Sequence, residues 1–302
     1  MTPLEASLPG TLQDPRVRPQ VICNDAFEAV FQPLAGGRLL RLRHMDHGDL
    51  LVPLDDEFID LDRWPKAGAF PLFPFHNRLR NAAFRHEGRT IKLNPNTTNG
   101  KDVMHGPAHR RPWHVSDQAA EYIEMALEYR ADTDWPFDFM ATQRFELHES
   151  SVKVRLALTN TGHTVMPGGI GWHPYFRPSL DGQIGLAAVR QLEPFAQGGP
   201  LETNLEGSPT AKVALPDGET RHFSGWTQAT ASIGEGINIT LMGDRELTCL
   251  AALHKSDYLC LEPVSHVAGA FEAMRANAGT NTGPRLLTPG ESLTGTAILS
   301  VA

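Results

Sequence analysis

Four segments of the sequence crowd polar side chains into apolar surroundings, and these are the places where chemistry is expected. The first holds His76, Asn77 and Arg78 inside a stretch rich in Phe and Pro, and the second centres on His105. The four segments are residues 70–84, 103–113, 168–176 and 258–271.

His173 and Glu262 are the side chains best suited to acid/base chemistry. His173 stands between Trp172 and an aromatic run at 174–176, and an imidazole beside a cleft can donate a proton near neutral pH. Glu262 follows the strand-like run YLCL, and buried glutamates are rare unless paired or catalytic. Each residue alone also fits a structural role, His173 as a hydrogen-bonded core residue and Glu262 as the partner of an arginine.

A metal site is the alternative use of the histidines. His105, His109 and His114 lie four and five residues apart, but the glycine and prolines among them break any helix. The three imidazoles are therefore not expected to share a face. The three cysteines are widely spaced without a CxxC pair, which predicts neither a disulfide framework nor a thiolate zinc site. We expect no metal.

The elements that must position these residues are strands. Apolar residues alternate with polar ones in three clear runs, as in half-buried antiparallel strands. Turn residues separate the runs, and only 61–66 suggests a short helical turn. This rhythm predicts one all-β domain over residues 1–302, with functional groups on loops and strand ends along one concave sheet face. The runs are 123–129, 152–158 and 237–241, and the turns are 36–37, 160–162 and 216–218.

Composition narrows the function classes. The 302 residues are 41% hydrophobic and 21% charged, with a formal net charge of −8, which is typical of a globular protein that does not bind nucleic acid. The net charge does not exclude a local basic pocket, because arginines cluster near Arg78 and at Arg110 and Arg111. The chain begins without a secretory signal and contains no apolar run long enough to span a membrane. We expect a cytoplasmic protein without a membrane partner.

Read in order, these segments resemble the aldose 1-epimerase family, also called galactose mutarotases. The resemblance covers nearly the whole chain from about residue 27, and four motifs in the same order, with a fifth block near the end, make it specific to the superfamily. The matching blocks are FPLFPFHNRLRNAAF (70–84), HGPAHRRPW (105–113), GIGWHPYF (169–176), EPVSH (262–266) and PGES (289–292).

The resemblance implies a galactose mutarotase-like supersandwich, a large antiparallel β-sandwich with an open cleft on one sheet. It makes His173 the general acid and Glu262 the general base of a ring-opening reaction that uses no cofactor. It also implies that Asn77, Arg78 and His105 hold the oxygens of a small-molecule sugar. Of the aromatic residues that could stack on the sugar, Trp172, Phe75, Phe176 and Trp226, we expect one or two to touch it, with Trp172 first.

The chain departs from the family at one sugar-binding position. Relatives carry an Asp three residues before a Phe in a DxxFxGW-like block, whereas this chain has Thr220 there, followed by Arg221 and His222. The hypothesis that follows is an anionic aldohexose, such as sulfoquinovose or a hexose 6-phosphate, held by Arg221, Arg78 or the 110–111 pair. Equally, Arg221 could point into solvent.

Two other function classes compete with the mutarotase. A sugar-binding or sensing protein could keep the cleft without turnover, although it would not need both His173 and Glu262. A glycosidase or lyase would need a second carboxylate near Glu262, for which Asp257 and Glu272 are the nearest candidates in sequence. The sequence leaves open whether the protein is a monomer or a homodimer.

Overall fold

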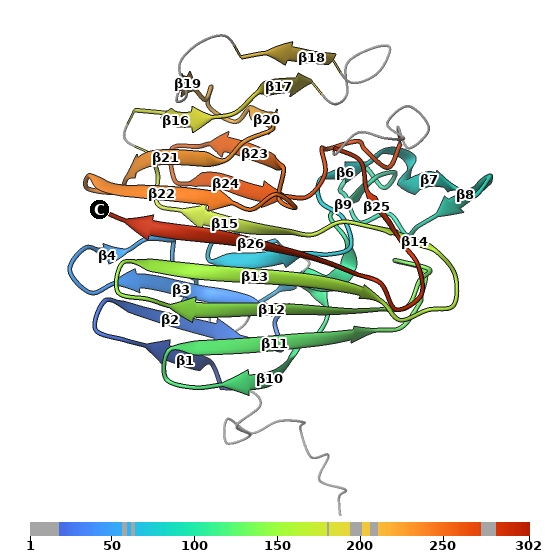
Figure 1. Cartoon of the computed structure of the whole chain (residues 1–302), viewed down its shortest axis with the longest axis horizontal. Coiled ribbons are helices and arrows are strands. Elements are labelled where there is room, and N and C mark those ends of the chain that lie inside the picture. The colour runs from blue at the N-terminus through green and yellow to red at the C-terminus, as the bar shows by residue number, and fades with distance from the viewer. Residues whose placement is uncertain are drawn as a thin grey trace, which may run out of the picture.

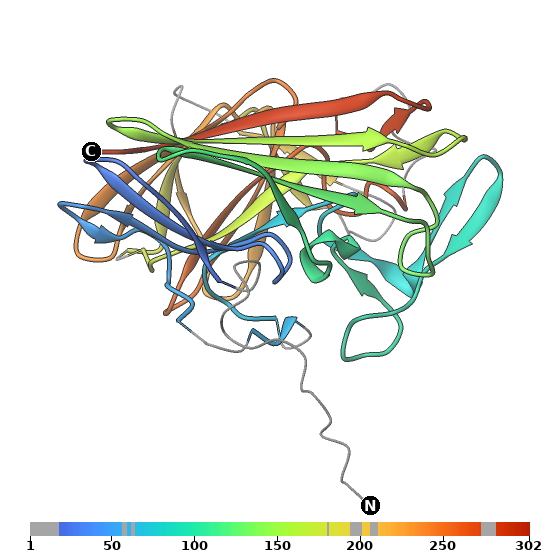
Figure 2. The same ribbon diagram turned by 90° about the horizontal axis from the view of Figure 1, so that it is seen from below.

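The computed structural model is an antiparallel β-sandwich and describes residues 18–55, 59–61, 64–179, 181–193, 201–205, 211–272 and 282–302. Two large sheets lie face to face as separate layers (Figure 2). The prediction of an all-β antiparallel sandwich is confirmed. No helix among the described residues is long and apolar enough to cross a membrane.

The first sheet has eleven strands and carries the residues of interest. In spatial order they are β1 (Gln20–Cys23), β2 (Phe27–Gln32), β3 (Arg38–His44), β5 (Ala69–Leu72), β15 (Gly171–Phe176), β24 (Leu259–Val264), β23 (Cys249–His254), β20 (Thr220–Ser224), β17 (Arg190–Glu193) and β18 (Leu201–Asn204), with β4 (Gly48–Asp49) paired to β3.

The second sheet has nine strands and is seen across the front of Figure 1. In spatial order they are β10 (His114–Gln118), β11 (Tyr122–Tyr129), β12 (Phe139–Leu147), β13 (Ser151–Asn160), β26 (Ser292–Val301), β22 (Ile237–Gly243), β21 (Gln228–Ile233), β16 (Gln183–Ala187) and β19 (Ala211–Ala214). The three strands predicted from alternation correspond to β11, β13 and β22.

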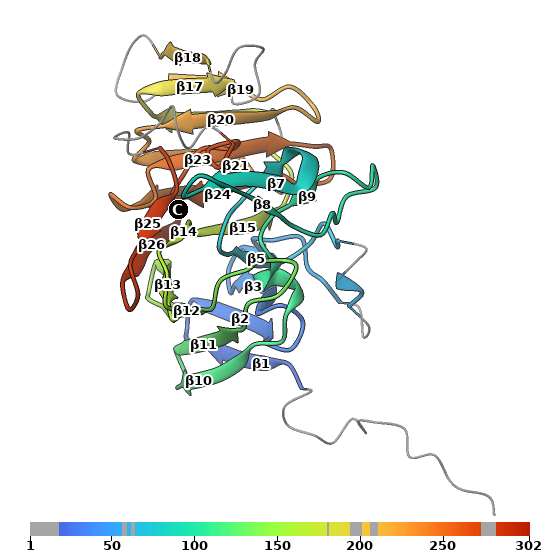
Figure 3. The same ribbon diagram turned by 90° about the vertical axis from the view of Figure 1, so that its right-hand side faces the viewer.

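Small elements gather at one end of the sandwich (Figures 1 and 3). They are the strand pairs β14 (Met166–Gly168) with β25 (Arg285–Leu287), β6 (Arg78–Leu79) with β9 (Val103–Met104), and β7 (Ala83–His86) with β8 (Arg89–Lys92), and the 3₁₀ helices η2 (Arg80–Ala82) and η3 (Pro107–Arg110). Of the helical turn expected at 61–66, Leu61 is in a 3₁₀ helix, residues 62 and 63 lie outside the described part, and residues 64–66 are not helical.

The main core lies between the sheets, and its side chains come from alternate positions of each strand. Trp172 and Phe176 of β15 enter it from the first sheet, and Phe145 and Leu156 enter it from the second. A smaller apolar cluster lies on the other face of the first sheet and includes Tyr175 of β15. The centre of the first sheet is therefore buried on both faces.

Glycine shapes the turn between β2 and β3, the hairpin predicted at 36–37. Gly36 has a φ of +78°, and a Cβ there would lie 1.9 Å from the carbonyl oxygen of His109. Only glycine permits both this backbone conformation and this close approach. The hairpin therefore packs directly against η3, which carries His109 next to the candidate site.

Candidate active site

Strand register brings the predicted residues into one row across the first sheet. His173 on β15 pairs with Phe70 on β5, and the register between β15 and β24 sets His173 opposite Glu262. Glu262 in turn pairs with Ala251 of β23, which pairs with His222 of β20. Because directly opposed residues share a face of a sheet, all five side chains lie on the outer face.

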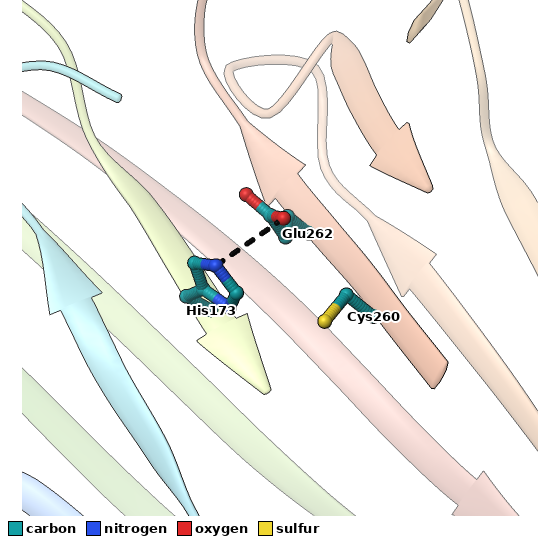
Figure 4. Close-up of side chains that lie close together, drawn as sticks. All are labelled: His173, Cys260 and Glu262. Carbon is teal, nitrogen blue, oxygen red and sulfur yellow. Dashed lines mark ion pairs between the residues drawn. The ribbon is translucent and has the colours of Figure 1, made fainter. Parts of the chain in front are cut away.

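The two predicted catalytic residues meet in this row. His173 Nε2 lies 3.4 Å from Glu262 Oε1, and the side chains point toward each other from neighbouring strands (Figure 4). The two residues are only 6% and 5% exposed, so the contact is shielded from water. Glu262 Oε2 and His173 Nδ1 are buried without a hydrogen-bond partner among the described residues. Each member of the pair therefore keeps one buried polar atom that no described residue satisfies.

Burial has opposite effects on the two pKa values. Loss of water raises the pKa of Glu262 to about 8, and the positive charge of Lys66 opposes this rise. Loss of water lowers the pKa of His173 well below its usual value, and the cations Lys66 and Arg38 lower it further. Between these two pKa values the pair holds a single proton. Such a pair can give a proton at one atom and accept one at another.

His105 lies beside the pair in a fixed tautomer. Its ring centroid is 5.4 Å from that of His173, and its Nδ1 accepts a hydrogen bond of 3.0 Å from the backbone N–H of Asn77. Since Nδ1 accepts, the proton of the neutral ring is on Nε2, which is left as a donor. Asn77 and His105 have φ values of 60° and 57°, and strain of this kind is characteristic of functional sites.

A groove of about 560 Å³ lies on the same face and contains Asn77, Arg78 and Arg221 in its lining, together with Thr220 and His222. Three of the predicted binding residues, Asn77, Arg78 and Arg221, thus lie along one groove. His105 is nearer to the His173–Glu262 pair, and Trp172 is not in the groove. Each arginine already has a carboxylate partner. Arg78 Nη1 lies 2.7 Å from Asp102 Oδ2, and Arg221 Nε lies 3.5 Å from Glu219 Oε1.

The prediction that Trp172 binds the sugar is wrong. Trp172 is fully buried in the core between the sheets, because it neighbours His173 in a strand and successive side chains point to opposite faces. The other stacking candidates, Phe75, Phe176 and Trp226, are buried in the same core.

Trp64 is the aromatic residue that the sequence reasoning missed. It is half-buried, its ring centroid lies 4.9 Å from that of His105, and its Nε1 donates a hydrogen bond of 3.2 Å to Tyr175 Oη. Its φ of 55° is unusual for a bulky residue. The only local signal was the short motif LDRWPK, which does not reveal where the indole points.

The histidines considered for a zinc site do not gather. His114 is exposed at the start of β10 in the second sheet, whereas His105 and His109 are buried beside the first. One other group of three potential ligands exists among the described residues: His173, Glu262 and Cys260, whose ligand atoms lie within 4.8 Å of one another. Burial raises the pKa of Cys260 well above its usual value, and the negative charge of Glu262 raises it further, so without a bound cation the thiol is protonated.

Comparison with known proteins identifies the family. The aldose 1-epimerase family model matches residues 20–259, which is most of the chain. The protein belongs to the aldose 1-epimerase family. Among curated proteins, this family member is 29% identical over 255 residues to the uncharacterized protein YphB of Escherichia coli K12, covering 78% of this chain and 84% of that protein. It is also 27% identical over 132 residues to the uncharacterized protein YihR of the same strain, covering 43% and 42%.

Solved structures share the fold of this aldose 1-epimerase family member. A putative aldose 1-epimerase from Escherichia coli K12 superposes with a TM-score of 0.79 at 24% identity, covering 94% of this chain and 98% of that one. Galactose 1-epimerase from Lactobacillus acidophilus NCFM superposes with a TM-score of 0.71 at 14% identity, covering 93% of each chain. The galactose mutarotase-like fold expected from the motifs is thereby confirmed.

Proposed function

We propose that the protein is a mutarotase that interconverts the α and β anomers of an aldohexose. The single observation that carries the proposal is the contact of 3.4 Å between His173 and Glu262, buried on one face beside His105 and an open groove. Family membership supports the same reaction.

The reaction requires two proton transfers and no other reagent. Glu262 accepts the proton of the anomeric hydroxyl, whose electrons form the C1=O1 double bond. The C1–O5 bond breaks, and O5 takes its electron pair and a proton from His173. Rotation about C1–C2 and the reverse transfers close the ring on either face of C1. Each transfer contributes a factor of about 10²–10⁴ in rate.

The single proton of the pair suits this scheme. One group must be protonated and the other free, and their roles reverse when the ring closes. Burial favours the form with the proton on Glu262, so the assigned acid/base roles need the proton to shift to His173 as the sugar binds. His105 Nε2–H is a donor for a sugar oxygen, and its fixed tautomer avoids reorganisation during the reaction.

The groove limits what the sugar substituents can be. Arg78 and Arg221 lie on it, as the anionic-sugar hypothesis requires, but Asp102 and Glu219 offset their charges and Glu193 adds a further carboxylate. Arg110 and Arg111 are bound to Asp134, so they are not free for an anion. We therefore place neutral hydroxyl-bearing aldohexoses ahead of sulfoquinovose or a hexose 6-phosphate.

The two carboxylates considered for a glycosidase have other surroundings than a shared buried site. Glu272 Oε2 lies 2.7 Å from Arg80, and Asp257 is exposed in a turn. A hydrolytic role with two carboxylates therefore has no support from these candidates.

Exchange NMR of anomers tests the proposal directly. Glucose, galactose, a hexose 6-phosphate and sulfoquinovose are each followed with and without the protein, and we expect faster exchange with the neutral sugars. Faster exchange only with the anionic sugars would reverse the order of substrates. Binding of a sugar without any acceleration would instead indicate a sugar-binding protein.

A further inference from the structure

Residues 64–67 form a strap across the outer face of the first sheet. Arg38 anchors the strap, because its Nη1 donates hydrogen bonds of 2.8 Å to the carbonyl oxygen of Ala67 and 3.4 Å to that of Pro65. Trp64 Nε1 donates a hydrogen bond to Tyr175 Oη, and Tyr175 is on the same face of β15 as His173. The strap is therefore tied to the strand that carries the catalytic imidazole.

Trp64 holds Lys66 in place next to the site. Lys66 Nζ lies 4.7 Å from the centroid of the Trp64 ring, within the range of a cation–π interaction. The indole also contacts the rings of His105 and His109, with centroid distances of 4.9 and 5.3 Å. Since the His105 ring lies 5.4 Å from that of His173, a continuous set of ring contacts connects Lys66 to the pair.

Lys66 differs from the arginines of the groove in having no ion-pair partner within the described part of the chain. Arg78 and Arg221 each lie within ion-pair distance of a carboxylate, although the contact of Arg221 with Glu219 is too long for a hydrogen bond and leaves Arg221 Nε unsatisfied among the described residues. The charge of Lys66 acts instead on the buried Glu262 and on Cys260.

We propose that Lys66 is a positioning residue whose positive charge sets the pH range over which the His173–Glu262 pair holds its single proton. This rests on the proposed function, in which the one-proton form is the active one. Several titratable or charged groups face the pair. They are Lys66 from the strap, Arg38 from β3, His76 and His105 from loops, His109 from η3, Tyr175 from β15, Tyr258 directly before β24, Cys260 from β24 and His222 from β20.

The sign of the effect follows from the charge. A nearby cation disfavours every added proton, so it lowers the pKa for the first and for the second proton of the pair. Removing the ammonium of Lys66 should raise both. The alkaline limit of activity, set by the Glu262 pKa of about 8, should then move upward together with the acidic limit.

The experiment compares pH profiles of kcat/KM for anomer exchange with a neutral aldohexose. Lys66→Met should move the acidic and the alkaline limit of the profile to higher pH by about 0.5–1 unit, and Lys66→Arg should keep both limits at their wild-type pH. Lys153→Met is the matched control, because it removes one lysine charge from β13 in the other sheet, where Lys153 pairs with Glu146. Lys66 is exposed, so its substitution should not disturb the core.

A second readout is independent of activity. Carbon-13 NMR of the glutamate carboxyl groups follows the titration of Glu262, whose signal is assigned by its loss in Glu262→Gln. We expect that signal to titrate at higher pH in Lys66→Met than in wild type. If wild type shows no anomer exchange, the proposed function fails, while this titration still tests Lys66.

Three results would overturn the proposal. One is an unchanged Glu262 titration in Lys66→Met. Another is a uniform loss of activity without movement of either limit, which would mean a structural role. The third is an effect confined to the KM of anionic sugars, which would make Lys66 an anion-binding residue.

Discussion

The centres of the two sheets differ in how deeply their strands are buried. In β12 and β13 of the second sheet, buried positions alternate with more exposed ones. In β15 and β24 of the first sheet, every position is buried. The second sheet faces solvent on its outer side, whereas the strap, the loop with His105 and η3 contact the outer side of the first.

The comparison shows how covering one face of a sheet changes the chemistry of a glutamate on that face. A glutamate on the open face of the second sheet, Glu146, lies 2.7 Å from Arg144 and 2.9 Å from Lys153, and these partners lower its pKa. Glu262, on the covered face of the first sheet, has a raised pKa because burial removes water. The same residue type is a surface ion-pair partner in one sheet and a buried carboxyl group, which we propose carries a proton, in the other.

Glutamine substitutions of Glu262 and Glu146 should show the largest difference in activity between the two sheets. Glu262→Gln should fold normally and lose at least about 10²-fold in the rate of anomer exchange, because the general base is gone. Glu146→Gln, the matched change in the second sheet, should leave the rate unchanged. Exchange NMR measures both rates, and retained activity in Glu262→Gln would mean that the base is elsewhere.

The difference in stability between wild type and Glu262→Gln should depend on pH. The pKa of Glu262 is raised in the folded state, so folding loses stability as pH rises from the unfolded value near 4.5 toward about 8. The variant lacks this loss, and it should be more stable than wild type at pH 8 by up to a few kcal/mol. Denaturant unfolding at pH 5 and pH 8 measures the difference. An equal gap at both pH values would mean that burial does not perturb Glu262.

Substitution of Trp172, the neighbour of His173 on β15, should lower stability but not activity. Trp172→Phe leaves a small cavity in the core between the sheets and should lower the unfolding free energy by about 1–2 kcal/mol. Its exchange rate should stay within about twofold of wild type, since the indole faces away from the site. A large rise in KM with unchanged stability would place Trp172 at the sugar after all.

The smallest effect is expected in the groove. Arg221→Gln should change KM for neutral aldohexoses by no more than about threefold, because the guanidinium is partly exposed and already paired with Glu219. Its KM for anionic sugars should change equally little. A selective rise of tenfold or more for the anionic sugars would restore the anionic-substrate hypothesis.

The family resemblance supplied the sandwich architecture. Alternation predicted the all-β class, because it is visible wherever one strand face is buried and the other is solvated. It predicted β11, β13 and β22, but it says little about β15 and β24, where both faces are buried. In GWHPYF the alternation of side chains about His173 could still have excluded Trp172, since adjacent residues point to opposite faces. The motif order, and not periodicity, pointed to His173 and Glu262.

Lys66 and Trp64 could not be predicted as parts of the site. Their position depends on hydrogen bonds from Arg38, which lies 27 and 29 residues before its acceptors, and on contacts with Tyr175, more than a hundred residues later. No local pattern encodes such contacts. The pairing of Arg78 with Asp102, 24 residues later, likewise became apparent only from the folded arrangement.

The most direct test of the central claim is a double-mutant cycle on the pair. Anomer exchange is measured for His173→Gln, Glu262→Gln and the double variant under identical conditions. If the two groups work as one unit, the double variant loses no more activity than the worse single variant. Losses that multiply would show that His173 and Glu262 act independently and would contradict the account.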